Sequence, residues 1–106
     1  MTTDTIIQAI EDATGVTFDE MQSRTRTDRI ADARFIFSYF AYNYAELTQK
    51  QVAMFMRVTE HTVGYHLMRY QILQGQNRRF REKAKAVREK IAEIENAIYN
   101  KKHGQQ

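Results

Sequence analysis

Two histidines with hydroxyl and carboxylate neighbours form the densest group of chemically versatile side chains in the sequence. His61 and His66 lie five residues apart in the stretch RVTEHTVGYHLMRY, residues 57–70. An imidazole can bind a metal, transfer a proton or form hydrogen bonds with another molecule. Positions five apart do not share one helix face and no third ligand is near, so the spacing disfavours a metal site. A contact with DNA and a satisfied helix-start histidine remain as interpretations of His61.

Arginines form a second group. Arg24, Arg26 and Arg29 lie in or directly after the polar segment QSRTRTD, residues 22–28, which has no apolar pattern and is predicted to be a loop. An apolar segment follows it. A short loop with three arginines before a buried helix favours contact with phosphates or with a minor groove, and a plain solvated loop is the alternative.

Charge is unevenly distributed along the chain. The net charge is +3, but residues 1–22 hold five acidic residues and no lysine or arginine. The remaining residues hold all 16 basic residues and eight of the 13 acidic ones, which is a net charge of +8. This asymmetry suits a body that binds a polyanion, and solvated helix faces are the alternative.

Several function classes are excluded by composition. The sequence has no cysteine, so it has no disulfide, thiolate metal site or thiol nucleophile. No Ser/His/Asp arrangement, paired-acid site or phosphate-binding loop is recognisable, so we predict no enzymatic activity, no cofactor and no metal. No apolar run approaches the roughly 20 residues of a membrane span, and we expect a cytoplasmic, nucleoid-associated protein without a membrane partner.

Helices are expected to position these side chains. The 106 residues include four glycines and no proline, too few turn formers for a sheet protein, so the predicted fold class is all-α. Thr17 and Thr48 each begin a capping box, Thr59 caps a further helix, and Gly15 ends the first. Apolar spacing predicts helices over residues 3–13, a very short segment after Thr17, 28–46, 49–56, 60–73 and 77–100.

The segment LTQKQVAMFMRVTEHTVGYHL, residues 47–67, fits a helix-turn-helix. Ala53 supplies the small residue where the two helices cross, and Val63, ten residues later, holds the second helix on the first. Thr59 supplies the cap after the turn, and the exposed first turn of the second helix then meets base edges in the major groove. Arg57 occupies the position where glycine is usual, which requires a positive φ or a turn of another shape.

Two stretches resemble the C-terminal DNA-binding domain (domain IV) of the bacterial replication initiator DnaA, which belongs to the Trp-repressor-like helical class. The first is SRTRTDRIADAR, residues 23–34, a basic loop that leads into the central helix. The second is EHTVGYH, residues 60–66, similar to D-H-T-T-V-L-H at the start of the family's recognition helix. The resemblance covers roughly residues 4–75 and implies a Trp-repressor-like helical domain that binds duplex DNA.

The resemblance also implies roles for individual residues. Arg26 resembles an arginine that enters the minor groove, and Arg34 resembles one that reaches the major groove. The other implied base-reading residues are Glu60, His61, Thr62 and Val63. Predicted contacts with DNA phosphates come from Arg24, Thr27, Thr48, Lys50, His66 and Arg69. The chemistry agrees, because an arginine suits a narrow A·T minor groove and a glutamate accepts from cytosine N4.

Some positions depart from the family. The segment between Thr48 and Glu60 is shorter and lacks a Gly-Gly turn, Phe35 stands in place of a glutamine, and Val63 stands in place of a threonine. The ATP-binding pattern G-x-x-x-x-G-K-[ST] does not occur. We therefore expect a stand-alone copy of the domain, of bacterial or phage origin.

We place the DNA-binding domain in residues 1–75, and a long C-terminal helix with a short disordered tail in residues 76–106. Apolar residues recur in this helix at a spacing of four and three from Phe80 to Ile98. This stripe either completes the core or pairs with a second chain, as a homodimer through residues 77–100.

The predicted function is sequence-specific binding of double-stranded DNA, in replication initiation or its regulation. Residues 60–73 are the expected recognition helix in the major groove, and residues 23–29 are the expected basic loop in the minor groove. A dimeric helix-turn-helix transcription regulator is one alternative. A protein-interaction adaptor that uses the C-terminal helix is the other.

Overall fold

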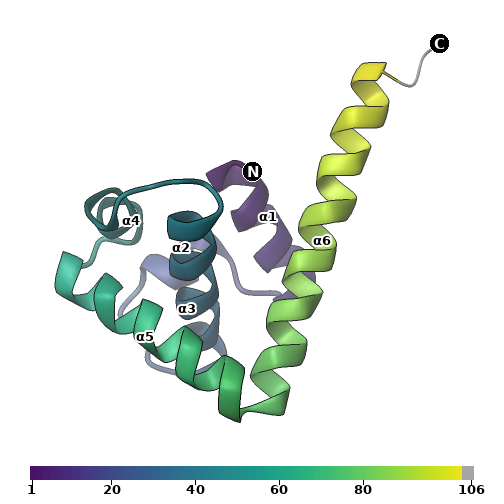
Figure 1. Ribbon diagram of the computed structural model, residues 1–106. Coiled ribbons are helices and arrows are strands. Elements are labelled where there is room, and N and C mark those ends of the chain that lie inside the picture. Colours follow the sequence, from purple (N-terminus) through teal and green to yellow (C-terminus); the bar gives the residue numbers. More distant parts are fainter. Residues whose placement is uncertain (104–106) are drawn as a thin grey trace.

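The computed structural model describes residues 1–103, which fold into helices joined by short loops (Figure 1). The helices are α1 (Thr3–Thr14), α2 (Phe18–Gln22), α3 (Asp28–Asn43), α4 (Gln49–Met56), α5 (Glu60–Gln76) and α6 (Arg78–His103). This range contains no strand, which confirms the all-α prediction, and none of its helices is long and apolar enough to cross a membrane. Helix α6 runs on to His103, and the rest of the predicted disordered tail, residues 104–106, lies outside the described residues.

Local capping interactions set several helix boundaries. The hydroxyls of Thr17 and Thr48 each accept from a backbone N–H three residues later, and the side chains of Glu20 and Gln51 accept from the backbone N–H of the capping threonine. Gly15 ends α1 with a φ of 78°, where a side chain would be strained. The predicted caps are therefore present. The central helix ends at Asn43, three residues earlier than the predicted 46.

Helix α3 lies at the centre of the molecule. Its Phe37 and Phe40 are fully buried, and α1, α2, α4 and α5 all contact it. Its Tyr39 ring stacks on Tyr70 of α5 with ring centroids 3.9 Å apart. Tyr42, near the end of the helix, is exposed. The aromatic run of α3 is thus mostly core, because neighbouring helices cover the helix on most sides.

Helix α6 completes the core with the first part of its apolar stripe. Phe80, Ala84, Val87 and Ile91 are buried in the same hydrophobic cluster as the side chains of α1 and α3. The helix lies along α1 and contacts α5, and its last turns extend beyond the rest of the molecule (Figure 1). Ile98, in those last turns, is 56% exposed. From Phe80 to Ile91 the stripe is therefore used within one chain.

Candidate nucleic-acid interface

The turn between α4 and α5 has the shape that the helix-turn-helix requires. Arg57 adopts the left-handed conformation, with φ 59° and ψ 43°, although it carries a side chain. The backbone N–H of Val58 donates to the carbonyl of Ala53 at 3.0 Å, which closes the turn. Thr59 then caps α5 by accepting from the N–H of Thr62 at 3.1 Å. Arg57 therefore adopts the left-handed conformation that glycine usually adopts at this position, at a cost of about 1–2 kcal/mol.

The two helices of the motif meet at the small and β-branched residues that the sequence indicates. Ala53 of α4 is 5% exposed, and Val63 of α5 is fully buried. The packing role expected of Val63 is therefore present. Its expected contact with bases conflicts with its burial, because a side chain with no exposed surface in the core cannot touch a base edge.

The first turns of α5 carry a polar surface that faces solvent. Glu60 and His61 are exposed, and neither side chain has a hydrogen bond or ion pair within residues 1–103. Thr62 is half-buried, and its hydroxyl lies 3.0 Å from that of Thr59. The Tyr65 side chain, one turn later, is 48% exposed. Two donor- or acceptor-bearing side chains are thus free at the start of this helix.

A shallow groove borders this surface and brings in residues that the sequence did not single out. It is lined by Gln49, Glu60, His61, Gly64, Tyr65 and Met68. The Met68 side chain is 51% exposed, which is unusual for a long apolar side chain in a small domain. Met68 follows Tyr65 by three residues, so the helical spacing in the sequence places both side chains on the same face of α5.

His66 lies inside the molecule and joins α5 to α3. Its side chain is 5% exposed, its Nδ1 lies 2.9 Å from the hydroxyl of Ser38, and its ring lies against Phe35. Burial, and secondly the charge of Arg34, lower the pKa of His66 from 6.5 to about 4. The expected phosphate contact therefore needs correction, because a neutral, covered imidazole offers a phosphate neither charge nor access.

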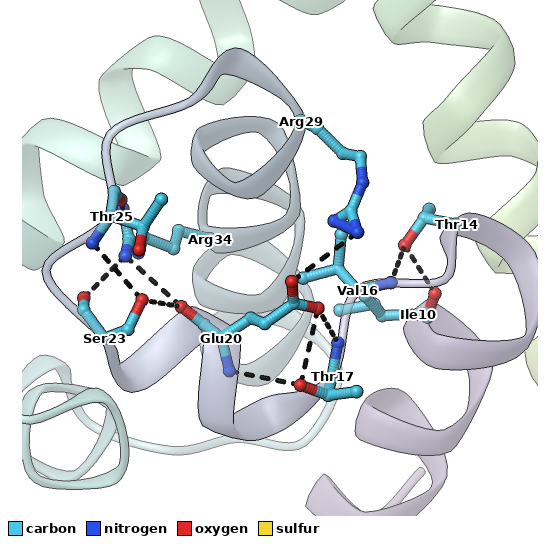
Figure 2. Close-up of polar contacts among 9 residues, drawn as sticks. All are labelled: Ile10, Thr14, Val16, Thr17, Glu20, Ser23, Thr25, Arg29 and Arg34. Carbon is cyan, nitrogen blue, oxygen red and sulfur yellow. Dashed lines mark hydrogen bonds and ion pairs between the residues drawn. The ribbon is translucent and has the colours of Figure 1, made fainter.

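The guanidinium of Arg34 holds the loop between α2 and α3 (Figure 2). Its Nε donates to the carbonyl of Met21 at 2.8 Å, and its Nη1 donates to the carbonyl of Thr25 at 2.8 Å. Its Nη2 donates to the carbonyls of Ser23 at 2.6 Å and Glu20 at 3.4 Å. Burial, and secondly Arg26, lower the pKa of Arg34.

This arrangement differs from the predicted role of Arg34 in the major groove. Four of the five N–H groups of the guanidinium are occupied here by backbone carbonyls, two from α2 and two from the loop that follows it. Arg34 therefore supports the loop from the inside, and the cations available to DNA are the residues on the loop's outer side.

The outer side of the loop is basic and unpaired. Arg24 and Arg26 are exposed and have no hydrogen bond or ion pair within residues 1–103. Arg29, by contrast, lies 3.5 Å from the carboxylate of Glu20 (Figure 2). Thr27 caps α3 without a side-chain hydrogen bond, so its hydroxyl and the free N–H groups of the helix start are available to an anion.

The remaining predicted phosphate contacts lie on α4 and α5. Thr48 and Lys50 are exposed at the start of α4, beside the N-terminal half of α5. The guanidinium carbon of Arg69 lies 6.0 Å from the centre of the Phe35 ring, and its Nε is buried without a hydrogen-bond partner. The covered Nε is not accessible to a phosphate, but the side chain as a whole is half-buried, has no ion pair within residues 1–103 and lines a surface cleft.

Two helices joined by a left-handed turn, an exposed helix start and a neighbouring basic loop together define a helix-turn-helix DNA-binding domain. The chain belongs to the family described as the bacterial DnaA protein helix-turn-helix, whose model matches residues 3–69. A search of curated protein sequences finds no significant match. The family match ends inside α5, so the last turns of α5 and all of α6 lie outside it.

Proposed function

We propose that the protein binds double-stranded DNA sequence-specifically, with the start of α5 in the major groove and the α2–α3 loop in the adjacent minor groove. The observation that carries this proposal is the pairing of two unpartnered surfaces. The exposed, unpaired Glu60 and His61 stand at the start of α5. The exposed, unpaired Arg24 and Arg26 stand on the loop that leads into α3.

The first turn of α5, residues 60–62, which we call the reading turn, has the chemistry of direct readout. Glu60 accepts a hydrogen bond from cytosine N4, and a threonine methyl group packs on the methyl group of thymine. His61 donates or accepts according to its tautomer. The exposed Tyr65 and Met68 add apolar surface along the same helix. Contacts of this kind distinguish base pairs in the major groove, where each pair presents its own pattern.

The loop supplies the second part of the interface. Arg26 enters a narrow minor groove, where the potential is most negative over A·T-rich sequence. Arg24, Thr27, Thr48 and Lys50 contact phosphates and set the position of the protein on the duplex. Because Arg34 already orders the loop, binding loses less conformational entropy than it would with a flexible arm.

Replication initiation or its regulation is the process we propose for this binding, with the protein acting on DNA in the nucleoid. Use of α6 as a dimerising coiled coil is less favoured, because Phe80, Val87 and Ile91 of its stripe are buried within the chain. We therefore propose a monomer that binds an asymmetric, A·T-rich site. An adaptor role for the exposed end of α6 has no comparable support.

Selection of bound duplexes from a random library by the full chain tests this function. We expect enrichment of an asymmetric, A·T-rich site. Arg26→Ala and His61→Ala should each weaken binding to that site by about 1–3 kcal/mol without changing the thermal melt. Arg78→Ala, an exposed α6 position, is the control. No enrichment, or mutants that bind like wild type, would reject the proposal, and a palindrome would favour a dimeric regulator.

A further inference from the structure

A cleft lies between the first turns of α3, the exposed side of α5 and the start of α6, and we call it the α3–α5–α6 cleft. Its α5 wall includes Tyr65 and Arg69, Phe35 of α3 lies beneath Arg69, and Arg79 and Lys83 come from α6. The part of α5 from Tyr65 to Leu73 lines it over about 12 Å at the rise of a helix. That length accommodates about three successive phosphates of one strand.

Resting on the proposed function, we propose that this cleft receives the sugar–phosphate backbone of the DNA strand that separates the two occupied grooves, and that Arg79 contacts a phosphate there. Arg79 lies on α6, beyond the residues that match the family. The interface is therefore larger than the reading turn and the basic loop, and it includes a helix that otherwise serves the core.

Position supports this assignment. A helix in a major groove and a loop in the adjacent minor groove lie on opposite sides of one backbone strand, so that strand crosses the protein surface between them. The cleft occupies that surface, because its walls are α5 and the start of α3, which directly follows the basic loop. A protruding backbone fits a concave surface, and the cleft continues from Tyr65 toward α6.

The charges in the cleft locate the contact. Lys83 and Asp32 neutralise each other at 2.9 Å, and Arg29 is paired with Glu20. Arg69 and Arg79 remain without an ion pair or hydrogen bond in the described part of the chain. Asp28 also lines the cleft, at its loop end, and has no ion pair there. A phosphate is therefore favoured beside the two unpaired arginines and repelled beside Asp28.

The salt dependence of binding tests the contact, because each neutralised phosphate contributes about 0.9 to the slope of log K against log salt. The probe is a mixed-sequence 24-base-pair duplex, and the protein is the full chain. We expect Arg79→Gln to reduce the slope by about 0.9 and to weaken binding several-fold at low salt.

Arg78→Gln is the matched control. It removes the same charge one residue away, from a side chain that is paired with Glu82 and lies on the other side of α6 with Lys85 and Arg88. We expect it to leave the slope at the wild-type value. Both variants remove exposed side chains, and their circular dichroism melts should match that of wild type.

The outcomes separate the two proposals. If wild type binds and the two variants have equal slopes, the cleft contact is wrong while the proposed function stands. If wild type binds no duplex at low salt, the proposed function itself fails. To place the contact, the duplex is replaced by the site obtained from the random-library selection, on which the protein has one register. Single methylphosphonate substitutions along one strand of that site should weaken wild-type binding at a position where they no longer weaken Arg79→Gln.

Discussion

His66 is a polar side chain that the fold encloses. Its imidazole lies 2.9 Å from the Ser38 hydroxyl and forms a cluster with the aromatic rings of Phe35 and Tyr65. A buried hydrogen-bonded pair costs little while both partners remain, and it is costly when one becomes charged. The pair therefore fixes how α5 sits on α3, and so it sets the direction in which the reading turn points.

The lowered pKa of His66 makes the stability of the fold depend on pH. As the pH falls, the unfolded chain binds the proton near its ordinary pKa of 6.5, whereas the folded chain resists it until about 4. This contribution to stability is complete above the unfolded pKa and is lost as the pH falls through the window between the two values.

We expect the free energy of unfolding of wild type, relative to His66→Gln, to fall by about 3 kcal/mol between neutral pH and a pH near the folded value. Urea denaturation at the two pH values measures the difference, and the glutamine variant removes the contribution of all other titrating groups. A constant difference between the two proteins would contradict the buried, neutral state of His66.

The position of His66 on α5 could be predicted from the sequence, but the burial of its side chain could not. Ser38, its partner, is 28 residues away, and the pairing exists only because α3 and α5 pack together. Val63 shows the converse, since its spacing from Ala53 correctly indicated a packing role. Its assigned contact with bases rested on resemblance to a family whose corresponding residue is a different type.

At the scale of elements, the α2–α3 loop is an irregular segment held by one side chain of the following helix. Arg34 donates to carbonyls from the end of α2 through Thr25 (Figure 2). Lysine cannot reproduce this, because a single ammonium lacks the planar set of five donors. The loop's shape, and with it the direction of Arg26, therefore depends on a guanidinium that faces inward.

Arg34→Ala should weaken DNA binding although the guanidinium donates to backbone carbonyls, because its loss frees the loop that carries Arg26. A double-mutant cycle with Arg26→Ala distinguishes the two roles of Arg34. If Arg34 positions the loop, the double mutant binds almost as well as Arg34→Ala alone, because the contribution of Arg26 is already lost. Fully additive losses would instead restore the predicted contact of Arg34 with the major groove.

Helix boundaries were predictable wherever the signal was local. The capping residues Thr17, Thr48 and Thr59 each act within three residues, and all three caps are present. The backbone conformation of Arg57 could not be predicted from the sequence. Whether a non-glycine residue adopts the left-handed region depends on how the flanking helices pack. The recognition helix runs to Gln76 rather than 73, since Gly75 is accommodated within it.

For the molecule as a whole, α6 shares one core with the DNA-binding helices. Phe80 is 1% exposed, and its ring meets Tyr70 of α5 edge-on at 5.4 Å. The apolar stripe of α6 could be predicted from its spacing, but its partner could not. A helix of the same chain and a helix of a second chain can each bury such a stripe. The position of α1 decides between them.

Phe80→Ala should destabilise the whole protein by about 3–5 kcal/mol, because it leaves a cavity where α6 packs on α5. Ile98→Ala, in the exposed last turns of α6, should change stability by less than about 0.5 kcal/mol. Denaturant titration compares the two. Small effects from both substitutions would mean that α6 is not part of the core, and sedimentation would then be expected to reveal a dimer.

The contact between α1 and α6 has a consequence for how the protein is made. Near one end of this contact the Met1 amino group lies 3.6 Å from the carboxylate of Glu95. The first residue of the described chain and a residue close to its other end are therefore neighbours in space. A ribosome delivers the N-terminus first, and Ile6 and Ile10 of α1 lack their α6 cover until nearly all of these residues are synthesised. The basic loop and the recognition segment are therefore synthesised before α6 can complete the core that holds them in place.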